Sequence, residues 1–321
     1  MMRKIWVLLA IAGFVIIFIA FSRSSVNDTT ESHAENYLKF TISLPSELYF
    51  AGEKVPLEYF DVYESLDREI HVNTYFQSQS IFYIKRAARF FPTIEKILQE
   101  NNIPDDFKYL AVAESGLANV VSPSDAAGFW QFLKPTAIEL GLEVNDKVDE
   151  RFHLEKSTKA ACVYLNKLYD KYGNWPMAAA AYNCGPNGLM KYVERQKEIN
   201  YFNLLLTEET ARYVYRILAI KLIIESPEKY GFVVKKDELY PPFDYSEVLV
   251  DTTINDLAGF ANSQGTNYKL LKLLNPWLRD NVLNTNGNKK YSLKIPSKNM
   301  RSLLYNENKA SQRSQIYNEE N

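Results

Sequence analysis

The chain has 321 residues, of which 46% are hydrophobic and 24% are charged, so it is long enough for one medium-sized globular domain and a smaller one. Its net charge is −2, its pI is about 6.1, and it contains no long run of one charge. These values exclude a basic surface of the kind that binds nucleic acid.

The first residues have the pattern of an export signal or a membrane anchor. Arg3 and Lys4 precede an apolar stretch, residues 5–21, and Arg23 follows it. As a helix this stretch would be about 26 Å long, close to the roughly 30 Å hydrocarbon core of a bilayer, which favours an uncleaved anchor. The alternative is a cleaved signal peptide within residues 1–24, because small residues at 20 and 22 suit a signal peptidase. Either reading places the residues from about 24 onward outside the cytoplasm.

Residues 25–62 are expected to form a linker or extended arm. Pro45, Gly52 and Pro56 interrupt any regular pattern there. Helical patterning follows, and residues 63–235 are predicted to form one mainly α domain. Its expected helix faces share the 3.6-residue period of apolar positions: Ile94, Ile97 and Leu98; Ala161, Tyr164, Leu165, Leu168 and Tyr172; and Val214, Ile217, Leu218, Leu222 and Ile223. Small residues at 178–181 form a further helix that lets another backbone approach closely.

One acid lies on the apolar face of a predicted helix. Phe107, Leu110 and Glu114 share one side by their spacing, and Gly116 supplies a left-handed cap. Pro104 suits the first turn of this helix. Burial raises the pKa of a carboxyl group, as a general acid near neutral pH requires. The alternative is a Glu that only caps the helix or lies at the edge of the core.

After Pro241-Pro242, residues 243–298 are predicted to form a small β-α-α-β module. Residues 248–250 and 291–295 have strand character, and residues 254–262 and 268–274 have helix character. Residues 299–321 are polar and poor in apolar side chains, as in a disordered tail.

Cysteine and histidine give little support to a metal site. Cys162 and Cys184 could pair in an exported protein, or they could be two buried small residues on neighbouring helices. The three histidines lie far apart and form no motif with the cysteines. No metal and no cofactor are expected.

Several motifs in a fixed order make the helical domain similar to a known family. They are Glu114-Ser115, Gly128-Phe129-Trp130-Gln131-Phe132, Ala181-Tyr182-Asn183, and Glu209-Thr210 with Tyr213-Val214. This order and spacing resembles the lysozyme-like catalytic domain of the soluble and membrane-bound lytic transglycosylases, especially their D-type branch, over about residues 75–225. Those enzymes cleave bacterial peptidoglycan.

The resemblance implies a role for each matched residue. Glu114 matches the single catalytic acid/base of the family. The positions that match substrate-binding elements are Ser115, Gln131, Tyr182, Asn183, Glu209 and Tyr213. Phe129 replaces the Leu of the family's Gly-Leu-x-Gln signature, which is a conservative change.

Each assignment has a structural alternative. Gln131 and Asn183 could satisfy buried backbone groups, because amides below the surface need partners. Tyr182 and Tyr213 could be core aromatics whose hydroxyl groups reach the surface. Glu209 stands near a predicted helix start, where the helix dipole favours an acid whether or not substrate binds.

With one catalytic acid, the resemblance implies a non-hydrolytic cleavage of the β-1,4 bond between N-acetylmuramic acid and N-acetylglucosamine. Hydrolytic glycosidases commonly use two carboxylates that flank the scissile bond, and no second Asp or Glu lies in a matching motif beside Glu114. Glu114 would protonate the leaving oxygen and then take the proton of the C6 hydroxyl, which closes a 1,6-anhydro ring. A hydrolytic muramidase and a non-catalytic peptidoglycan-binding protein are the alternatives.

The C-terminal module resembles a LysM domain, a family that binds glycans containing N-acetylglucosamine. The similarity rests on Leu257-Ala258, residues 270–274, Asn275-Pro276 and residues 293–296. Residues 250–254 depart from the usual Gly-Asp-Thr-Leu. Glycan binding is expected, with a purely structural lid as the alternative. Peptidoglycan strands are therefore the expected partner, together with the membrane if the N-terminal segment is uncleaved, and the sequence does not indicate the oligomeric state.

Overall fold

The computed structural model describes residues 42–285 and 289–302. The predicted anchor or signal segment and nearly all of the predicted tail lie outside these ranges. Within them, no helix has both the length and the apolar character needed to cross a membrane. The chain divides into two compact units, Met1–Ser43 and Leu44–Asn321, and all the helices and strands named below belong to the second.

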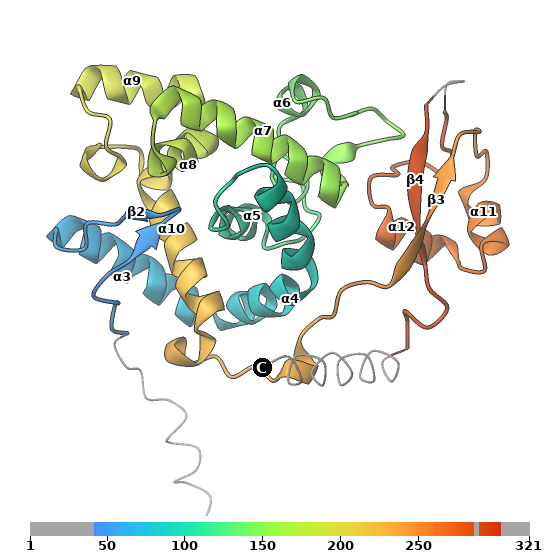
Figure 1. Cartoon of the computed structure of the whole chain (residues 1–321), viewed down its shortest axis with the longest axis horizontal. Helices are drawn as coiled ribbons and strands as arrows, with labels where there is room; N and C mark the ends of the chain where they lie inside the picture. Colours follow the sequence, from blue (N-terminus) through green and yellow to red (C-terminus); the bar gives the residue numbers. More distant parts are fainter. Residues whose placement is uncertain (1–41, 286–288, 303–321) are drawn as a thin grey trace, which may run out of the picture. The chain divides into compact units, whose positions relative to one another are not determined.

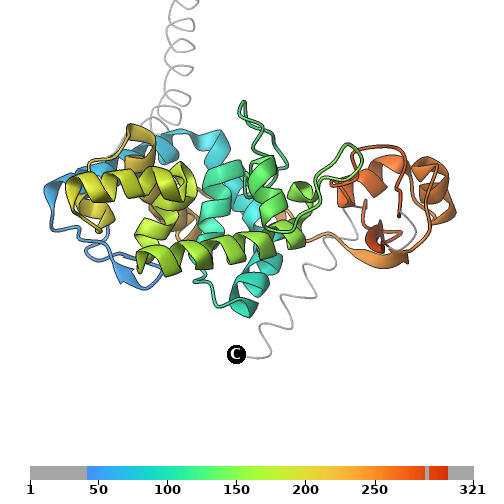
Figure 2. The same cartoon turned by 90° about the horizontal axis from the view of Figure 1, so that it is seen from above.

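Helices dominate the chain up to about residue 238, which confirms the mainly α prediction (Figures 1 and 2). The α-helices of this region are α3 (Phe60–Tyr75), α4 (Gln77–Glu100), α5 (Phe107–Ser115), α6 (Lys134–Glu139), α7 (Leu154–Tyr172), α8 (Trp175–Cys184), α9 (Pro186–Gln196) and α10 (Glu208–Glu225). Short 3₁₀ turns connect them: η2 (Glu150–Phe152), η3 (Tyr201–Asn203), η4 (Pro227–Tyr230) and η5 (Lys236–Glu238).

The end of the segment that was predicted to be a linker or extended arm contains a hairpin. Strands β1 (Tyr49–Phe50) and β2 (Glu53–Lys54) pair antiparallel, and Gly52 supplies a φ of 82° at their turn. Phe50 is fully buried, with its ring 5.4 Å from that of Phe107. Helix α3 then begins at Phe60. The same turn residues that suggested a broken linker therefore form a tight hairpin, which is held by one buried aromatic side chain.

Helix α5 lies among the other helices and is buried on more than one side. Phe107 and Leu110 are fully buried, as predicted, but Tyr109 and Val112 on other faces are buried too. Helices α4 and α10 both pack against it (Figure 1). The helix starts at Phe107, whose N–H bonds to the carbonyl of Pro104, so Pro104 precedes the first turn and does not lie within it.

Helices α7 and α8 end and begin at residues that suit helix termini. Gly173 ends α7 with a φ of 75°, and the Asn174 side chain caps α8 by accepting the Met177 N–H at 2.9 Å. The two helices pack together. Cys162 on α7 is buried and Cys184 on α8 is half-buried, and both are free thiols.

The C-terminal region forms the predicted β-α-α-β module. Its elements are β3 (Tyr245–Val250), α11 (Leu257–Ser263), α12 (Tyr268–Leu274) and β4 (Tyr291–Pro296). The strands pair antiparallel, with Val248 opposite Leu293. Asp256 and Asn267 cap the two helices with their side chains.

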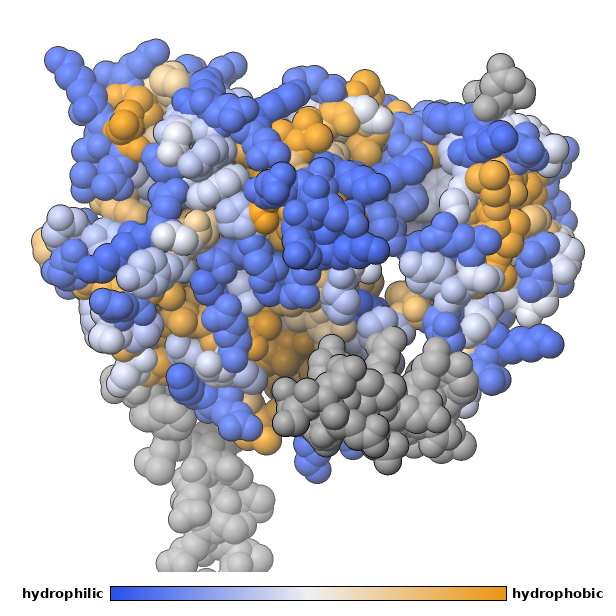
Figure 3. Space-filling model, viewed as in Figure 1, coloured by the Kyte–Doolittle hydropathy of each residue, from blue (hydrophilic) through white to orange (hydrophobic). Residues whose placement is uncertain are grey.

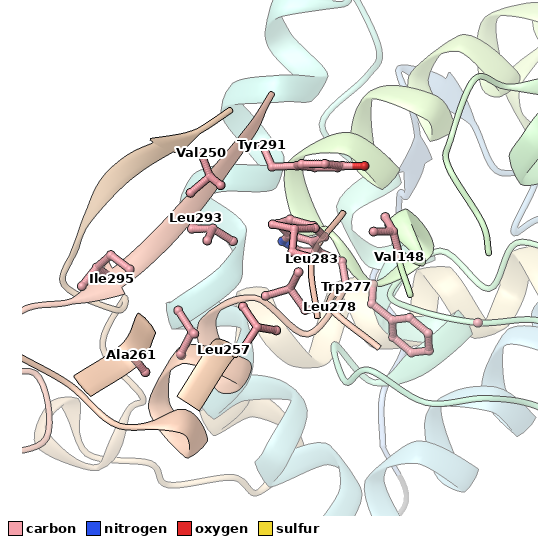
Figure 4. Packing of buried hydrophobic residues seen from close by; sticks show 13 residues of the cluster. Val148, Val250, Leu257, Ala261, Trp277, Leu278, Leu283, Tyr291, Leu293 and Ile295 are labelled. Carbon is pink, nitrogen blue, oxygen red and sulfur yellow. The ribbon is translucent and has the colours of Figure 1, made fainter. Parts of the chain in front are cut away.

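This module shares its hydrophobic core with the helical domain. Trp277, Leu278 and Leu293 of the module belong to one buried cluster with Val148 and Phe152 (Figure 4). Backbone hydrogen bonds reinforce the contact, from Asp149 N–H to the Trp277 carbonyl at 2.9 Å and from Arg279 N–H to the Lys147 carbonyl at 2.8 Å. The module is therefore packed onto residues 147–152 and is not merely tethered by a linker.

On the face seen in Figure 3, hydrophilic residues predominate and hydrophobic residues gather in separate patches.

Candidate active site

Glu114 lies in the last turn of α5, one residue before the chain leaves the helix. Gly116 takes the left-handed conformation with a φ of 59°, and its N–H bonds to the Val112 carbonyl at 2.8 Å. The earlier residues of α5 are buried, whereas Glu114 is only half-buried by surface area. The helix thus carries an acid from the core to a place that solvent reaches.

Tyr213 contacts this acid from α10. Its phenolic hydroxyl donates a short hydrogen bond to Oε1 of Glu114. The Tyr213 side chain is almost fully buried, with 1% of its surface exposed. Because a buried ring with a packed backbone has few rotamers, Tyr213 fixes the position of the Glu114 carboxyl group.

Glu114 has the pKa of a group that works near neutrality. Burial raises the pKa of its carboxyl group from 4.5 to about 7, and the negative charge of Glu209 adds to this rise. The hydrogen bond from Tyr213 and the positive charge of Arg216 act in the opposite direction. At neutral pH the carboxyl group is therefore divided between its protonated and ionised forms, as a group that serves as acid and then as base requires.

Ser115 connects α5 to the loop that carries the Gln131 motif. Its hydroxyl lies 2.9 Å from the Phe129 carbonyl and 3.0 Å from the Ala111 carbonyl. The Phe129 ring packs edge-on against Phe90 of α4, at 4.9 Å between centroids. Ser115 therefore positions the loop beside Glu114, and no hydrogen bond in the structure joins its hydroxyl to the carboxyl group of Glu114 within the described residues.

Gln131 holds its own loop together. It has a φ of 49°, and its Nε2 donates to the carbonyls of Gly128 at 2.8 Å and Val120 at 3.2 Å. Gly128 allows the loop to lie against η2, because a Cβ atom there would be 1.9 Å from the Arg151 carbonyl oxygen. The Gln131 amide nitrogen therefore donates to backbone carbonyls of its own loop.

Tyr182 and Asn183 reach the same region from the end of α8. The Tyr182 hydroxyl donates to the Trp130 carbonyl at 2.7 Å, and Oδ1 of Asn183 accepts from the Thr210 hydroxyl at 2.9 Å. Burial raises the pKa of Tyr182 well above its usual value, and the charge of Glu114 raises it further. Tyr182 therefore lies within electrostatic range of the carboxyl group.

Glu209 lies in the first turn of α10 and is exposed. It contributes a negative charge that Glu114 senses. Its neighbour Glu208 is the one that forms ion pairs, with Arg68 at 3.0 Å and Arg212 at 3.3 Å. Of the six residues predicted beside Glu114, Tyr213 bonds to its carboxyl group, Ser115 follows it in the chain, and Tyr182 and Glu209 interact with it by charge. Gln131 bonds to its own loop, and Asn183 bonds to Thr210.

Sequence reasoning missed Arg216. It stands three residues after Tyr213 on α10, so the two side chains share one helix face. Its guanidinium lowers the pKa of Glu114, and its Nε lies 3.9 Å from Oε2 of the buried Glu69. The spacing of Tyr213 and Arg216 was the available signal.

Trp130 has a structural role in the loop that carries Gln131. Its side chain is buried, and its Nε1 donates to the Thr158 hydroxyl at 2.9 Å, which anchors the loop to α7.

The described residues contain no group of three or more His, Cys, Asp or Glu side chains placed to hold a metal ion.

Comparison with known proteins identifies both modules. Residues 91–205 match the transglycosylase SLT domain, and residues 246–299 match the soluble lytic transglycosylase C-terminal LysM-like domain. The first of these matches includes Glu114, Gln131 and Tyr182, and it ends before α10.

Curated relatives match over part of their length. The membrane-bound lytic murein transglycosylase D of Escherichia coli strain K12 is 29% identical over 213 residues, which cover 63% of this chain and 45% of that protein. The protein of the same name from strain CFT073 of serotype O6:H1 gives the same values. A putative tributyltin chloride resistance protein of Alteromonas sp. strain M-1 is 25% identical over 114 residues, 35% of this chain and 55% of that protein. The chain thus spans about half the length of the curated relatives that it matches.

Proposed function

We propose that this chain, which contains an SLT transglycosylase domain and a LysM-like domain, is a peptidoglycan lytic transglycosylase with Glu114 as its single acid and base. The observation that carries the proposal is the half-buried Glu114 carboxyl group, with a pKa of about 7, in contact with the Tyr213 hydroxyl. Both a proton donor and a proton acceptor are then available from one side chain near neutral pH.

The first step breaks the bond between C1 of N-acetylmuramic acid and the O4 of N-acetylglucosamine. Protonated Glu114 gives its proton to O4, which leaves as a hydroxyl group. The carbonyl of the sugar's own N-acetyl group stabilises C1, and Glu114 is left as a carboxylate. The hydrogen bond from Tyr213 and the charge of Arg216 stabilise this carboxylate.

The second step closes the anhydro ring. The Glu114 carboxylate takes the proton of the C6 hydroxyl, and O6 forms a bond to C1. The carboxyl group returns to its protonated form, and no water is consumed. Ser115, Gln131 and Tyr182 support this proposal because they hold backbone carbonyls of the loop at residues 128–130. Asn183 accepts from the Thr210 hydroxyl, and Tyr213 orients the acid.

Hydrolysis is the second candidate, because one observation favours it. Glu209 is a second carboxylate within electrostatic range of Glu114, and a two-carboxylate site could activate water. Its exposure at the start of α10 supports a weaker role. We assign Glu209 to substrate contact and charge tuning.

The test is a product analysis. Isolated peptidoglycan is digested by the full chain, and the soluble fragments are examined by mass spectrometry. Muropeptides with 1,6-anhydro ends support the proposal, whereas exclusively reducing ends would establish hydrolysis. Glu114→Gln should lower the rate by about 100-fold to 10,000-fold, the usual contribution of a general acid or base. Glu194→Gln, which changes an exposed acid on α9, is the matched control and should keep full activity.

Two further proposals follow from the modules and the N-terminal sequence. The protein acts at the cell envelope, on the periplasmic side, held by the segment at residues 5–21. The LysM-like module binds peptidoglycan glycan, which a sacculus pull-down of the full chain with Glu114→Gln would show.

A further inference from the structure

A cavity of about 390 Å³ lies between the helical domain and the C-terminal module. Its walls come from α4, from residues 117–119, from residues 152–155, from residues 240–245 that lead into β3, and from the module around Trp277 and Lys294. Its volume is in the range of small-ligand sites, which is roughly 300–1,000 Å³. None of the seven residues assigned above to the active site, from Glu114 to Tyr213, lines it.

The cavity carries an excess of positive charge. Arg86, Arg89 and Lys294 line it, and Glu155 is its one carboxylate among the described residues. Glu155 is already engaged, since it forms a short ion pair with Lys294 and lies 3.2 Å from Nδ1 of His153. The two arginines are thus the cations without a carboxylate partner in the described part of this cavity.

Each of these arginines is oriented but keeps donors to spare. Nη1 of Arg86 donates to the Gly116 carbonyl at 2.9 Å, and Nε of Arg89 donates to the Pro241 carbonyl at 2.9 Å. The Arg89 guanidinium also lies over the ring of Phe243, at 4.2 Å from its centroid. A guanidinium has five N–H donors, so both side chains can still bind an anion through a planar fork.

Burial makes an anion at Arg89 favourable. It lowers the pKa of the Arg89 guanidinium, because the protein removes water from the charge without supplying an acid in exchange. The neighbouring walls are aromatic, with Phe90, Phe129 and Trp277 among them. This surface suits a carboxylate carried on a partly apolar chain.

The cavity also lies close to Glu114 along the chain. Its wall at residues 117–119 begins three positions after Glu114, and Phe129 accepts the hydrogen bond from Ser115. Leu117, which lines the cavity, is three residues from Glu114, so the two Cα atoms are at most about 11 Å apart. A stem peptide of about four residues extends roughly 14 Å. A stem attached to a sugar at Glu114 therefore has the length to enter the cavity.

From these observations we infer that the cavity binds the carboxylate-bearing peptide stem of a peptidoglycan strand, with Arg89 and Arg86 as the anion-binding residues. This inference rests on the proposed substrate. The glycan chain itself is uncharged where its lactyl groups are joined to peptide, so the stem supplies the carboxylates. The enzyme would then prefer strands that carry peptides over bare glycan.

Binding is tested by calorimetric titration of the full chain with Glu114→Gln. The probe is the disaccharide tetrapeptide released from peptidoglycan by muramidase, compared with the same compound after amidation of its carboxyl groups. Amidation is expected to weaken binding at least tenfold, and Arg89→Gln should weaken binding of the unmodified probe by a similar factor. Arg195→Gln, which changes an exposed arginine on α9, is the matched control. Equal binding of the two probes would overturn the inference, and this comparison holds even if Arg89→Gln fails to fold.

Activity separates this inference from the proposed function. Arg89→Gln should raise KM for peptide-bearing strands about tenfold, with kcat unchanged, and should leave cleavage of strands stripped of peptides by an amidase unaltered. An equal loss on both substrates would show that Arg89 has only a structural role. If the wild-type chain forms no anhydro ends on either substrate, the proposed function fails, while the titration still decides whether the cavity binds stem peptides.

Discussion

The hydroxyl of Tyr213 donates a hydrogen bond to Oε1 of Glu114, which joins two residues that stand 99 positions apart in the chain. The contact links α10 to the last turn of α5. It acts on the ionised carboxyl group, because a donor stabilises the carboxylate and lowers its pKa.

Removing this donor should slow the reaction. Tyr213→Phe is expected to lower kcat by about 10-fold to 100-fold, since a hydrogen bond to a charged group contributes about 1.5–3 kcal/mol. The pH at which activity falls on the alkaline side should also rise, because the pKa of Glu114 rises when the donor is lost. A pH–rate profile measures both effects. Tyr215→Phe changes a buried tyrosine on the same helix and should alter neither.

The wild-type rate should itself depend on pH in a defined direction. Glu114 must be protonated at the start of the reaction, and its pKa is about 7. We therefore expect kcat/KM to fall as the pH rises through about 7. The pH at which kcat/KM is half-maximal reports the pKa of Glu114 in the free enzyme. A rate that is constant from pH 5 to 9 would remove Glu114 as the proton donor.

The same acid should reduce stability at alkaline pH. The pKa of Glu114 is higher in the folded chain, about 7, than its ordinary value of 4.5. The stability that its proton provides is therefore complete below pH 4.5 and is lost as the pH rises through 7. Glu114→Gln has no such loss, so at pH 8 it should be more stable than the wild type by at most about 3 kcal/mol. Urea denaturation at pH 4 and pH 8 measures the difference, which should disappear at the lower pH.

The close packing of Gly128 gives a test of the fold around the site. Gly128→Ala should destabilise the protein by about 3 kcal/mol or more, because the added Cβ atom meets the Arg151 carbonyl oxygen at 1.9 Å. Gly141→Ala is the control. Gly141 also has a positive φ, 85°, but its Cβ would meet no atom within 4 Å, so only the backbone cost of about 1–2 kcal/mol applies. Equal free energies of unfolding for the two variants would contradict the described packing.

The ion pair between Glu155 of α7 and Lys294 of β4 should hold the C-terminal module in place. Burial acts to raise the pKa of Glu155, but His153 and Lys294 lower it from 4.5 to about 2. Its contribution to stability is therefore present above pH 4.5 and is lost as the pH falls through 2. A double-mutant cycle with Glu155→Gln and Lys294→Met should give a coupling free energy of about 1–3 kcal/mol at pH 7.

The exposed pair of Lys167 and Glu139, 3.8 Å apart, is the control for this cycle. Its coupling should be about 0.5 kcal/mol or less, because water screens exposed charges. A Glu155–Lys294 coupling free energy no larger than this would show that the ion pair does not stabilise the packing of the module.

The sequence was sufficient where local rules decide the structure. The period of apolar residues placed α4, α7 and α10, the run of small residues placed α8, and Gly116 ended α5 where a left-handed residue was expected. The β-α-α-β order of the C-terminal module was predicted in the same way. The sequence did not predict the hairpin at Gly52, since a two-residue turn becomes a hairpin only when Phe50 has Phe107 to pack against.

The same distinction between local and tertiary information applies to the candidate site. Glu114, Gln131, Tyr182 and Tyr213 were identified by motif and spacing, which are local properties of the chain. The tertiary structure decided what each side chain contacts: Tyr213 reaches Glu114, while the Gln131 amide nitrogen serves its own loop. The tertiary structure also brought Arg216 close enough to Glu114 for its positive charge to lower the pKa of the carboxyl group, although no motif marked this arginine.

The sequence by itself determined the helices, the two modules and the acid that faces inward, because propensity, capping and hydrophobic period act over a few residues. Only the tertiary structure decided the pKa of Glu114, the shared core around Trp277 and the arginine-lined cavity. Burial and charge depend on distances between segments far apart in the chain, and those distances are fixed only when the core is packed.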